Sequence, residues 1–424
     1  METEFLNVLH RELVPALGCT EPIAVAYAAA KAREVLAQFP ERIELCCSGN
    51  IIKNVKGVTV PNSGGLCGMD AAAVLGVVGG NASRELEVLE GIRPEHIERT
   101  KQLLSEEFFS CKLQEGVENL YIEATVYAGE HKVCVKIVDR HTMITEIIYD
   151  DHLIYVAGGA EEQKDEVDWS QWSVKNIIRF ADEAAIDDIK PLLDRQIEMN
   201  SAIAEEGLAN KYGGQVGRTL LAVFENDVRT RAKARAAAGS DARMGGCSLP
   251  VVTNSGSGNQ GMTVSLPVIE YARSLKVPPE ILYRSLLVSN LISIYQKHYI
   301  GILSAFCGAV TAASGSGAAI TYMSGGTYEQ ICNTIINVLA NVSGIICDGA
   351  KASCAAKIAS AVDAAIMAHH MGMKNLVFRS GEGIVQDNVE ETIKSIGYIG
   401  RVGMKTTDVE ILNIMIDKVK FNEM

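Results

Sequence analysis

The chain has 424 residues, enough for two or three domains, and its 48% hydrophobic and 21% charged residues are typical of a folded, soluble protein. A net charge of −13 argues against nucleic-acid binding, which needs basic patches. The first residues, M-E-T-E-F-L-N-V-L-H-R-E, carry acids where a signal peptide needs basic residues. We therefore expect a cytoplasmic protein whose 11 cysteines are reduced thiols or metal ligands.

The first third of the chain contains both helical and strand patterns. Helical periodicity predominates up to residue 107, with one short strand predicted over 42–47. The pattern then changes to period-two alternation of apolar and polar residues, which predicts a meander of strands over 119–126, 131–138 and 143–148. A polar, acidic linker is expected over 160–168.

From residue 174 the chain is predicted to be helical almost to its end. Three segments, 244–269, 299–328 and 330–347, lack charged residues. The second is long enough for a membrane span, but its six glycines leave too little aliphatic content. We instead expect tightly packed buried helices around a pocket lined by backbone.

These patterns predict an α+β fold. A mostly helical catalytic body is expected to be built from both chain ends, with a smaller α/β domain inserted between them. The expected division is residues 1–84 for the N-terminal part of the body, 85–170 for the inserted domain, and 171–424 for the helical, cluster-binding part.

Three cysteines, Cys307, Cys347 and Cys354, lie in a Gly-, Ala- and Ser-rich part of the chain. Three thiolates can hold an iron–sulfur cluster and leave one iron open as a Lewis acid. The competing interpretation is that each is a small buried hydrophobe, because free cysteine is among the most buried residue types. No C-x-x-C pair is present, so spacing alone leaves both interpretations open. Apart from Cys19, the other cysteines are interpreted as core or incidental, and Cys111 and Cys134 as dispensable.

The separation of Cys347 from Cys354 raises a geometric problem. Seven residues of regular helix would place the two sulfurs about 10 Å apart along the axis. Asp348 is a favourable N-cap residue, so we predict that a helix begins there. Cys347 would then lie in the preceding loop and Cys354 on the second turn, with the helix N-terminus favouring the anionic thiolates.

A nine-residue polar loop over 253–261 stands between apolar segments. Its three glycines permit close approach of a ligand, and its Ser, Asn and Gln side chains add hydrogen-bonding groups. A substrate carboxylate therefore fits here, and the competing interpretation is a solvated surface loop. The residues expected to contact substrate are Asn254, Ser255, Gly256, Ser257, Gly258, Asn259 and Gln260.

Three single residues complete the candidate site. Cys19 lies in G-C-T-E-P, in a turn beside a predicted helix start, which predicts a lowered pKa for its thiol; the competing interpretation is a buried structural cysteine. Lys53 lies in a Gly- and Asn-rich segment and is a candidate for anion binding, although a lone loop lysine is usually solvated. Lys351 lies between Cys347 and Cys354 and is a candidate base or carboxylate contact.

Together these motifs resemble one family. G-C-T-E-P, G-N-I-I-K-N, N-S-G-S-G-N-Q-G, L-S-A-F-C-G, C-D-G-A-K-x-x-C and G-E-G-I-V occur in the order typical of the L-cysteine desulfidases, iron–sulfur relatives of the L-serine dehydratases. The resemblance implies an oxygen-sensitive [4Fe-4S] enzyme that converts L-cysteine to pyruvate, ammonia and hydrogen sulfide without pyridoxal phosphate. It also implies that Cys307, Cys347 and Cys354 hold the cluster, and that Cys19 takes part as a base or a fourth ligand.

The implied chemistry suits these residues. The substrate thiol would bind the open iron, and Cys19, with Lys351 in reserve, would remove the α-proton. We expect a small amino-acid substrate and no nucleic-acid or membrane partner, and leave a homo-oligomer open. The nearer alternative is dehydration of L-serine or L-threonine on the same cluster. The more distant one is a non-catalytic protein that binds structural zinc.

Overall fold

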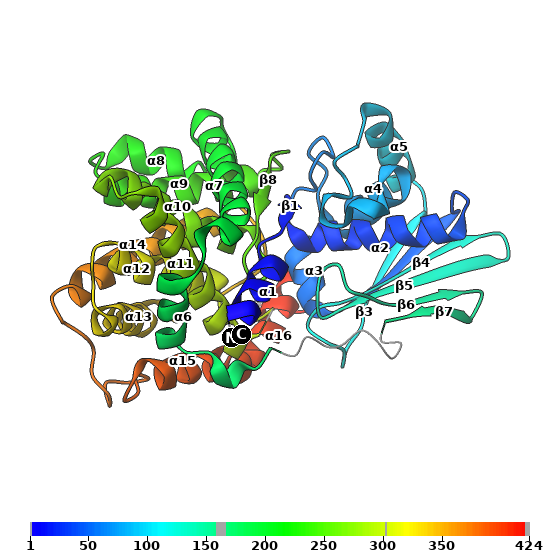
Figure 1. Ribbon diagram of the computed structural model, residues 1–424. Helices are drawn as coiled ribbons and strands as arrows, with labels where there is room; N and C mark the ends of the chain where they lie inside the picture. The colour runs from blue at the N-terminus through cyan, green and yellow to red at the C-terminus, as the bar shows by residue number, and fades with distance from the viewer. Residues whose placement is uncertain (1, 158–166, 302, 420–424) are drawn as a thin grey trace.

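The computed structural model of the chain describes residues 2–157, 167–301 and 303–419. Figure 1 shows a helical body beside a lobe in which helices lie against a sheet. The α+β class predicted from the sequence is confirmed. The expected acidic linker over 160–168 falls mostly outside the described residues.

The helical body contains the first helix of the chain and the helices that follow the sheet. Its helices are α1 (Glu2–Glu12), α6 (Val174–Glu183), α7 (Ile186–Ala209), α8 (Val216–Val223), α9 (Val228–Met244), α10 (Gly258–Leu275), α11 (Pro279–Ile300), α12 (Gly308–Met323), α13 (Tyr328–Val342), α14 (Cys354–Gly372), α15 (Val389–Tyr398) and α16 (Lys405–Met415), with short 3-10 or π turns at Trp169–Gln171 and Ile399–Gly403.

Apolar side chains of α1 join the core formed by the helices that follow the sheet. Phe5 of α1 packs against Trp172 and Phe180, with ring centroids 4.6 and 5.0 Å away. Burial of a large apolar side chain of this kind stabilises a fold by roughly 1.5–3 kcal/mol. The uncharged segments form α10, α12 and α13, which are buried as expected. None of the helices in the described residues combines the length and apolar character that a membrane span needs.

The α/β lobe is built on a six-stranded sheet in the order β3-β2-β4-β5-β6-β7. Its elements are α2 (Thr20–Leu36), β2 (Arg42–Cys47), α3 (Gly49–Val55), α4 (Gly68–Gly79), a 3-10 segment (Ala82–Glu87), α5 (Pro94–Leu104), β3 (Phe109–Leu113), β4 (Tyr121–Ala128), β5 (His131–Val138), β6 (Ile144–Tyr149) and β7 (His152–Val156). The predicted meander corresponds to β4, β5 and β6, while β3 and β7 lie outside it.

The hydrophobic cores divide the chain differently from the boundary expected at residue 84. The core of the lobe contains residues from Ala16 to Ile147. It begins before residue 84 because β2 is part of the lobe's sheet, where it pairs in parallel with β3 and antiparallel with β4. Within residues 1–84, α1 packs into the helical body, whereas α2 and α4 pack on the lobe's side. Because β2 belongs to the lobe's sheet, α2 and α4 on either side of it in the sequence also belong to the lobe.

A small second sheet connects the two parts of the molecule. β1 (Pro15–Leu17) pairs antiparallel with β8 (Pro250–Val252). β1 leads directly into Gly18 and Cys19, and β8 leads directly into the polar loop over 253–261. Two motifs more than 200 residues apart in the sequence are thereby fixed beside each other.

Candidate active site

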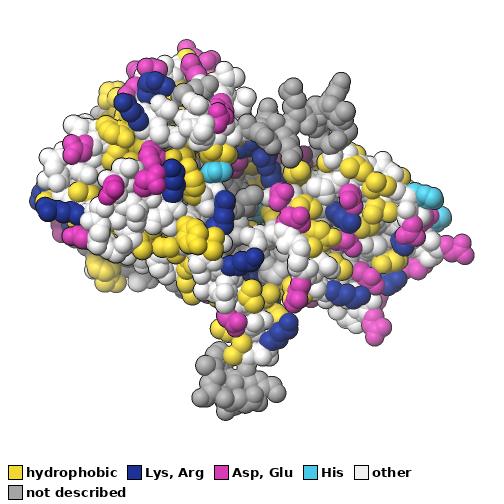
Figure 2. All heavy atoms as spheres, turned by 90° about the horizontal axis from the view of Figure 1, so that it is seen from below, with side chains coloured by type: hydrophobic (Ala, Val, Ile, Leu, Met, Phe, Trp, Pro, Cys, Tyr) yellow, Lys and Arg dark blue, Asp and Glu magenta, His cyan; other side chains and the backbone are white. Residues whose placement is uncertain are grey.

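A cavity of about 100 Å³ is lined by residues from both the helical body and the α/β lobe. Figure 2 shows the molecular surface hollowed where the two parts meet. The three cysteines of the C-terminal half line the cavity together with Cys19. Residues that the sequence separates widely thus share one small space, which suits a small molecule better than a polymer.

Two loops carry Cys307 and Cys347 and brace each other. Cys307 donates its backbone N–H to Ile345 O at 3.1 Å, and Cys347 donates its own to Ala305 O at 2.6 Å. A bridge between Phe306 and Ile346 completes a short antiparallel contact. The relative position of these two cysteines is therefore set by backbone hydrogen bonds.

Cys307 and Cys354 lie at helix starts, and Cys347 lies in the loop before α14, although that helix does not begin where predicted. Cys307 is the N-cap of α12, and Cys354 is the first residue of α14, whose N-cap is Ser353. The prediction that Asp348 caps this helix is wrong, because its carboxylate pairs with Lys351 at 3.0 Å and also with Lys357. The helix begins later, so Cys354 lies closer to its N-terminus than expected.

Burial favours the neutral thiol at Cys307 and Cys354. It raises the pKa of Cys307 to about 12, to which the neighbouring Cys347 contributes, and it raises the pKa of Cys354. Among residues 2–157, 167–301 and 303–419, no three His, Cys, Asp or Glu side chains meet so as to hold a metal ion. The three thiols line a shared space rather than converge on one point.

Cys19 and Glu21 form a hydrogen-bonded pair at the lobe side of the cavity. The Cys19 thiol donates to Glu21 Oε2 at 3.0 Å, and His141 Nε2 lies 3.9 Å from the other carboxylate oxygen. Burial alone would raise the pKa of Glu21, but His141 and the Cys19 thiol lower it to about 2. Burial and the Glu21 charge together raise the pKa of Cys19 well above its ordinary value. The predicted lowering of the Cys19 pKa is wrong, because the nearby carboxylate and burial outweigh the helix N-terminus.

Arg243 was missed by the sequence analysis and is a prominent cation of the cavity. Its side chain is only 2% exposed, and its Nε donates to Gly18 O at 2.8 Å. Its Nη2 has no hydrogen-bond partner among the described residues. Gly258 makes room for the guanidinium, since a Cβ there would lie 2.5 Å from Nε. A buried guanidinium N–H without a partner is suited to bind a carboxylate.

Lys297, in α11, is the second cation that the sequence analysis missed. Burial lowers the pKa of its amine to about 8. Within the part of the chain that the structure describes, its Nζ has no hydrogen-bond or ion-pair partner. A buried amine that titrates near neutral pH is a candidate proton acceptor. Arg243 and Lys297 each stand just before a long uncharged segment, and an isolated cation at such an edge is the signal that would have found them.

The polar loop over 253–261 contributes some of its residues to the cavity and uses others internally. Ser255, Gly256, Ser257, Asn259 and Gln260 line the cavity. Asn254 instead donates to Asn290 Oδ1 at 3.0 Å and accepts from Ser293 at 3.1 Å, so its amide is occupied by the core.

Two lining residues of this loop offer free hydrogen-bonding atoms. Asn259 Oδ1 and Gln260 Oε1 are buried without a hydrogen-bond partner among the described residues. These oxygens are acceptors, which suit an ammonium group rather than the carboxylate expected from the sequence.

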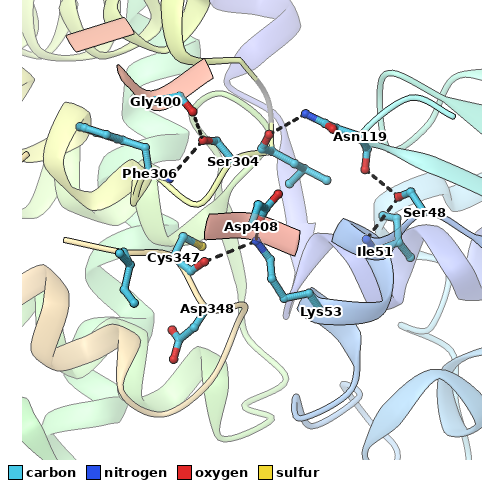
Figure 3. Close-up of polar contacts among 12 residues, drawn as sticks. Ser48, Ile51, Lys53, Asn119, Ser304, Phe306, Cys347, Asp348, Gly400 and Asp408 are labelled. Atoms are coloured by element: carbon cyan, nitrogen blue, oxygen red, sulfur yellow. Dashed lines mark hydrogen bonds and ion pairs between the residues drawn. The ribbon is translucent and has the colours of Figure 1, made fainter. Parts of the chain in front are cut away.

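The two predicted lysines point elsewhere. Lys351 pairs with Asp348 and does not line the cavity. Lys53 is buried, forms an ion pair with Asp408 and donates to Cys347 O at 3.4 Å (Figure 3). Neither residue lines the cavity; Lys53 reaches the site through the Cys347 segment and through its charge, which helps to lower the pKa of Lys297.

The sequence of the chain matches a known protein family. Residues 83–413 match the serine dehydratase alpha chain family. The chain belongs to that family. The match contains Arg243, Lys297 and the three C-terminal cysteines, while Cys19 and Lys53 precede it. Family membership indicates a lyase-type enzyme related to serine dehydratase.

Several curated relatives are similar over nearly their whole length. A UPF0597 protein of Lachnoclostridium phytofermentans is 52% identical over 417 residues, which cover 98% of this chain and 100% of the relative. One of Desulfitobacterium hafniense is 52% identical, covering 98% and 96%. One of Finegoldia magna is 47% identical, covering 98% and 99%. The chain thus matches these relatives across both its lobe and its helical body.

Proposed function

We propose that this protein catalyses β-elimination of L-cysteine to pyruvate, ammonia and hydrogen sulfide, without pyridoxal phosphate, at a [4Fe-4S] cluster held by Cys307, Cys347 and Cys354. The observation that carries the proposal is that these three thiols line the same small cavity as the unpartnered Nη2 of Arg243 and the amine of Lys297. Metal ligands, an anion-binding group and a proton acceptor are thereby close together.

The donor set fits an iron–sulfur cluster. Soft sulfur donors suit iron–sulfur chemistry, and the helix starts at Cys307 and Cys354 favour thiolates. A cluster takes its cysteines on separate irons, so thiols arranged around a shared space suit it better than they suit one ion. When bound through three cysteines, such a cluster supplies one open iron as a Lewis acid for the leaving group.

The cavity's own charges fit a zwitterionic amino acid. The free Nη2 of Arg243 would bind the α-carboxylate. The buried carboxylate of Glu21 and the free oxygen of Gln260 would hold the α-ammonium. Opposite charges at fixed places orient the substrate, and the small volume limits the size of its side chain.

Lys297 is the residue we assign as general base, in place of Cys19 and Lys351. Its neutral amine would take the proton from Cα, the C–H electron pair would form the double bond, and sulfide would leave with the C–S pair. The resulting aminoacrylate would react with water to give pyruvate and ammonia. Cys19, whose thiol donates to Glu21, would help to hold that carboxylate in place.

Dehydration of L-serine is the second candidate, and the family description favours it. The same residues would act, with hydroxide in place of sulfide as the leaving group. L-Cysteine is preferred here because a soft sulfur leaving group matches thiolate-bound iron.

Anaerobic turnover assays test the proposal. Protein reconstituted with iron and sulfide is expected to release equal amounts of sulfide and pyruvate from L-cysteine, and at least about tenfold less pyruvate from L-serine, on the argument from ligand softness. Higher turnover of L-serine would reverse the substrate assignment. No turnover of either substrate by cluster-loaded protein would contradict the lyase assignment.

A further inference from the structure

The segment that carries Cys347 is held by a residue from the other part of the molecule. Lys53 lies on α3 of the α/β lobe and is 2% exposed. Its ammonium donates to the backbone oxygen of Cys347 at 3.4 Å and pairs with the carboxylate of Asp408 on α16. Figure 3 shows the side chain directed between these two partners. One amine thus joins the lobe, the cysteine segment and the C-terminal helix.

A second contact lies two residues further along the same segment. Gly349 has a φ of +94°, and a Cβ there would lie 2.4 Å from the carbonyl oxygen of Lys53. The backbone of α3 therefore packs directly on the cysteine segment. Both the side chain and the main chain of Lys53 contact the cysteine segment. The same segment is also held by the hydrogen bond from the Cys347 N–H to Ala305 O.

Helix α3, which carries Lys53, is held in place by contacts of its own. Ser48 caps α3 by accepting from Ile51 N at 3.4 Å, and it donates to Asn119 O at 2.7 Å. A Cβ at Gly49 would meet Leu412 of α16 at 2.5 Å, so α3 and α16 are closely packed. Lys53 is therefore presented from a rigid helix and neutralised by a second one.

We propose that the Lys53–Asp408 ion pair is a positioning device that holds Cys347 in place, so that the C-terminal helix α16 determines how firmly the protein retains its cluster. The inference rests on the proposed role of Cys347 as a cluster ligand. Neither residue lines the cavity; Lys53 donates to the Cys347 carbonyl, and Asp408 acts through its ion pair with Lys53. Partners of this kind, one step removed from a metal, typically change metal affinity by about 10- to 100-fold.

Three variants test this proposal in the full chain. Lys53→Met removes the ammonium and leaves Asp408 unpaired. Lys53→Met/Asp408→Leu removes both charges, so no unpaired buried charge remains to weaken folding. Lys56→Met is the matched control, because Lys56 also joins α3 to α16, through the Met415 carbonyl, without contacting Cys347.

Two readouts are measured on each folded variant. The first is the rate at which a chelator removes iron from the anaerobically reconstituted protein. The second is hydrogen exchange of the Cys347 amide in the metal-free protein, measured by mass spectrometry. We expect both to be at least about tenfold faster in the single and double variants, and unchanged in Lys56→Met.

Wild-type iron release and amide exchange in the double variant would overturn the proposal, and so would an equal effect of Lys56→Met. If the wild-type protein took up no cluster, the proposed function would be contradicted, and the positioning role of Lys53 would not. The exchange rates, which need no metal, would still decide whether Lys53 holds Cys347.

Discussion

The chain gathers cysteines in two places, the cavity and the sheet of the α/β lobe, and the two surroundings differ. In the sheet, Cys46 of β2 lies opposite Glu123 of β4, and Cys134 of β5 lies opposite Thr125, two residues further along β4. Burial and Glu123 raise the pKa of both thiols, that of Cys134 to about 11. At the cavity, Cys307 and Cys354 lie at helix starts, with Lys357 and Arg243 near Cys354.

The difference shows that closeness of thiols does not by itself make a metal site. Thiolates need positive potential, which helix N-termini and cations supply and carboxylates oppose. Loops before helices also let side chains from different segments turn towards one space, whereas strands fix neighbouring side chains in rows. Burial raises the pKa of Cys307 to about 12, so burial does not separate the two groups; the helix starts and the nearby cations make the cavity better suited to a cluster than the thiols beside Glu123.

The largest effect is expected from Cys347→Ser. A serine oxygen is a hard, weakly acidic donor, so the variant should hold less than about a tenth of wild-type iron and lose more than about 100-fold of its activity. Iron analysis of anaerobically reconstituted protein measures this. Wild-type iron content in the variant would remove Cys347 from the ligand set.

The next largest effect is expected from Lys297→Arg. Arginine stays protonated, so kcat should fall by about 10²- to 10⁴-fold while iron content is unchanged. Because burial lowers the pKa of Lys297 to about 8, its neutral form increases with pH. The kcat/KM of the wild type should therefore rise through pH 7 and level off above about 8. A profile that falls over this range would exclude Lys297 as the base.

A smaller effect is expected from Arg243→Lys, which keeps the charge but loses the free Nη2. Loss of one charge-assisted hydrogen bond, about 1.5–3 kcal/mol, should raise KM for L-cysteine by about 10- to 100-fold. Iron content should not change, and steady-state kinetics on loaded protein measure the effect. If KM stayed at the wild-type value, the carboxylate would have to bind elsewhere.

The smallest effect is expected from the sheet cysteines. Cys134→Ser and Cys111→Ser should keep wild-type iron content and turnover, since both lie on strands of the lobe sheet away from the cavity. Loss of iron in either variant would break the contrast between the two cysteine groups.

The sequence predicts candidate site residues that stand in distinctive local motifs, and it does not predict residues that reach the site through tertiary contacts alone. The three C-terminal cysteines and the glycine-rich loop carry signals in their own neighbours. Arg243 and Lys297 carry only one such signal, their place at the edge of a long uncharged segment, and His141 carries none, because an isolated charge does not indicate which face of an element it will occupy. Asp348 shows a different limit: its capping propensity was outweighed by ion pairs with Lys351 and Lys357, which lie close to it in the sequence.

The fold shows the same division between local and distant information. The alternation of residues in β4 and β5 is a local property, and their strands were predicted closely. The partners of β2 come after residue 108, so its place between β3 and β4 depends on long-range pairing. The boundary predicted at residue 84 separates β2 from these partner strands. The α+β class does not depend on which strands pair.

The most direct test of the account is an anaerobic absorption spectrum of reconstituted wild-type protein, with metal analysis, before and after addition of L-cysteine. The account predicts about four irons per chain, the charge-transfer band of a [4Fe-4S] cluster, and a larger spectral change with L-cysteine than with L-serine, because a soft thiolate binds an open iron well. A colourless protein that binds stoichiometric zinc through the same cysteines would contradict it.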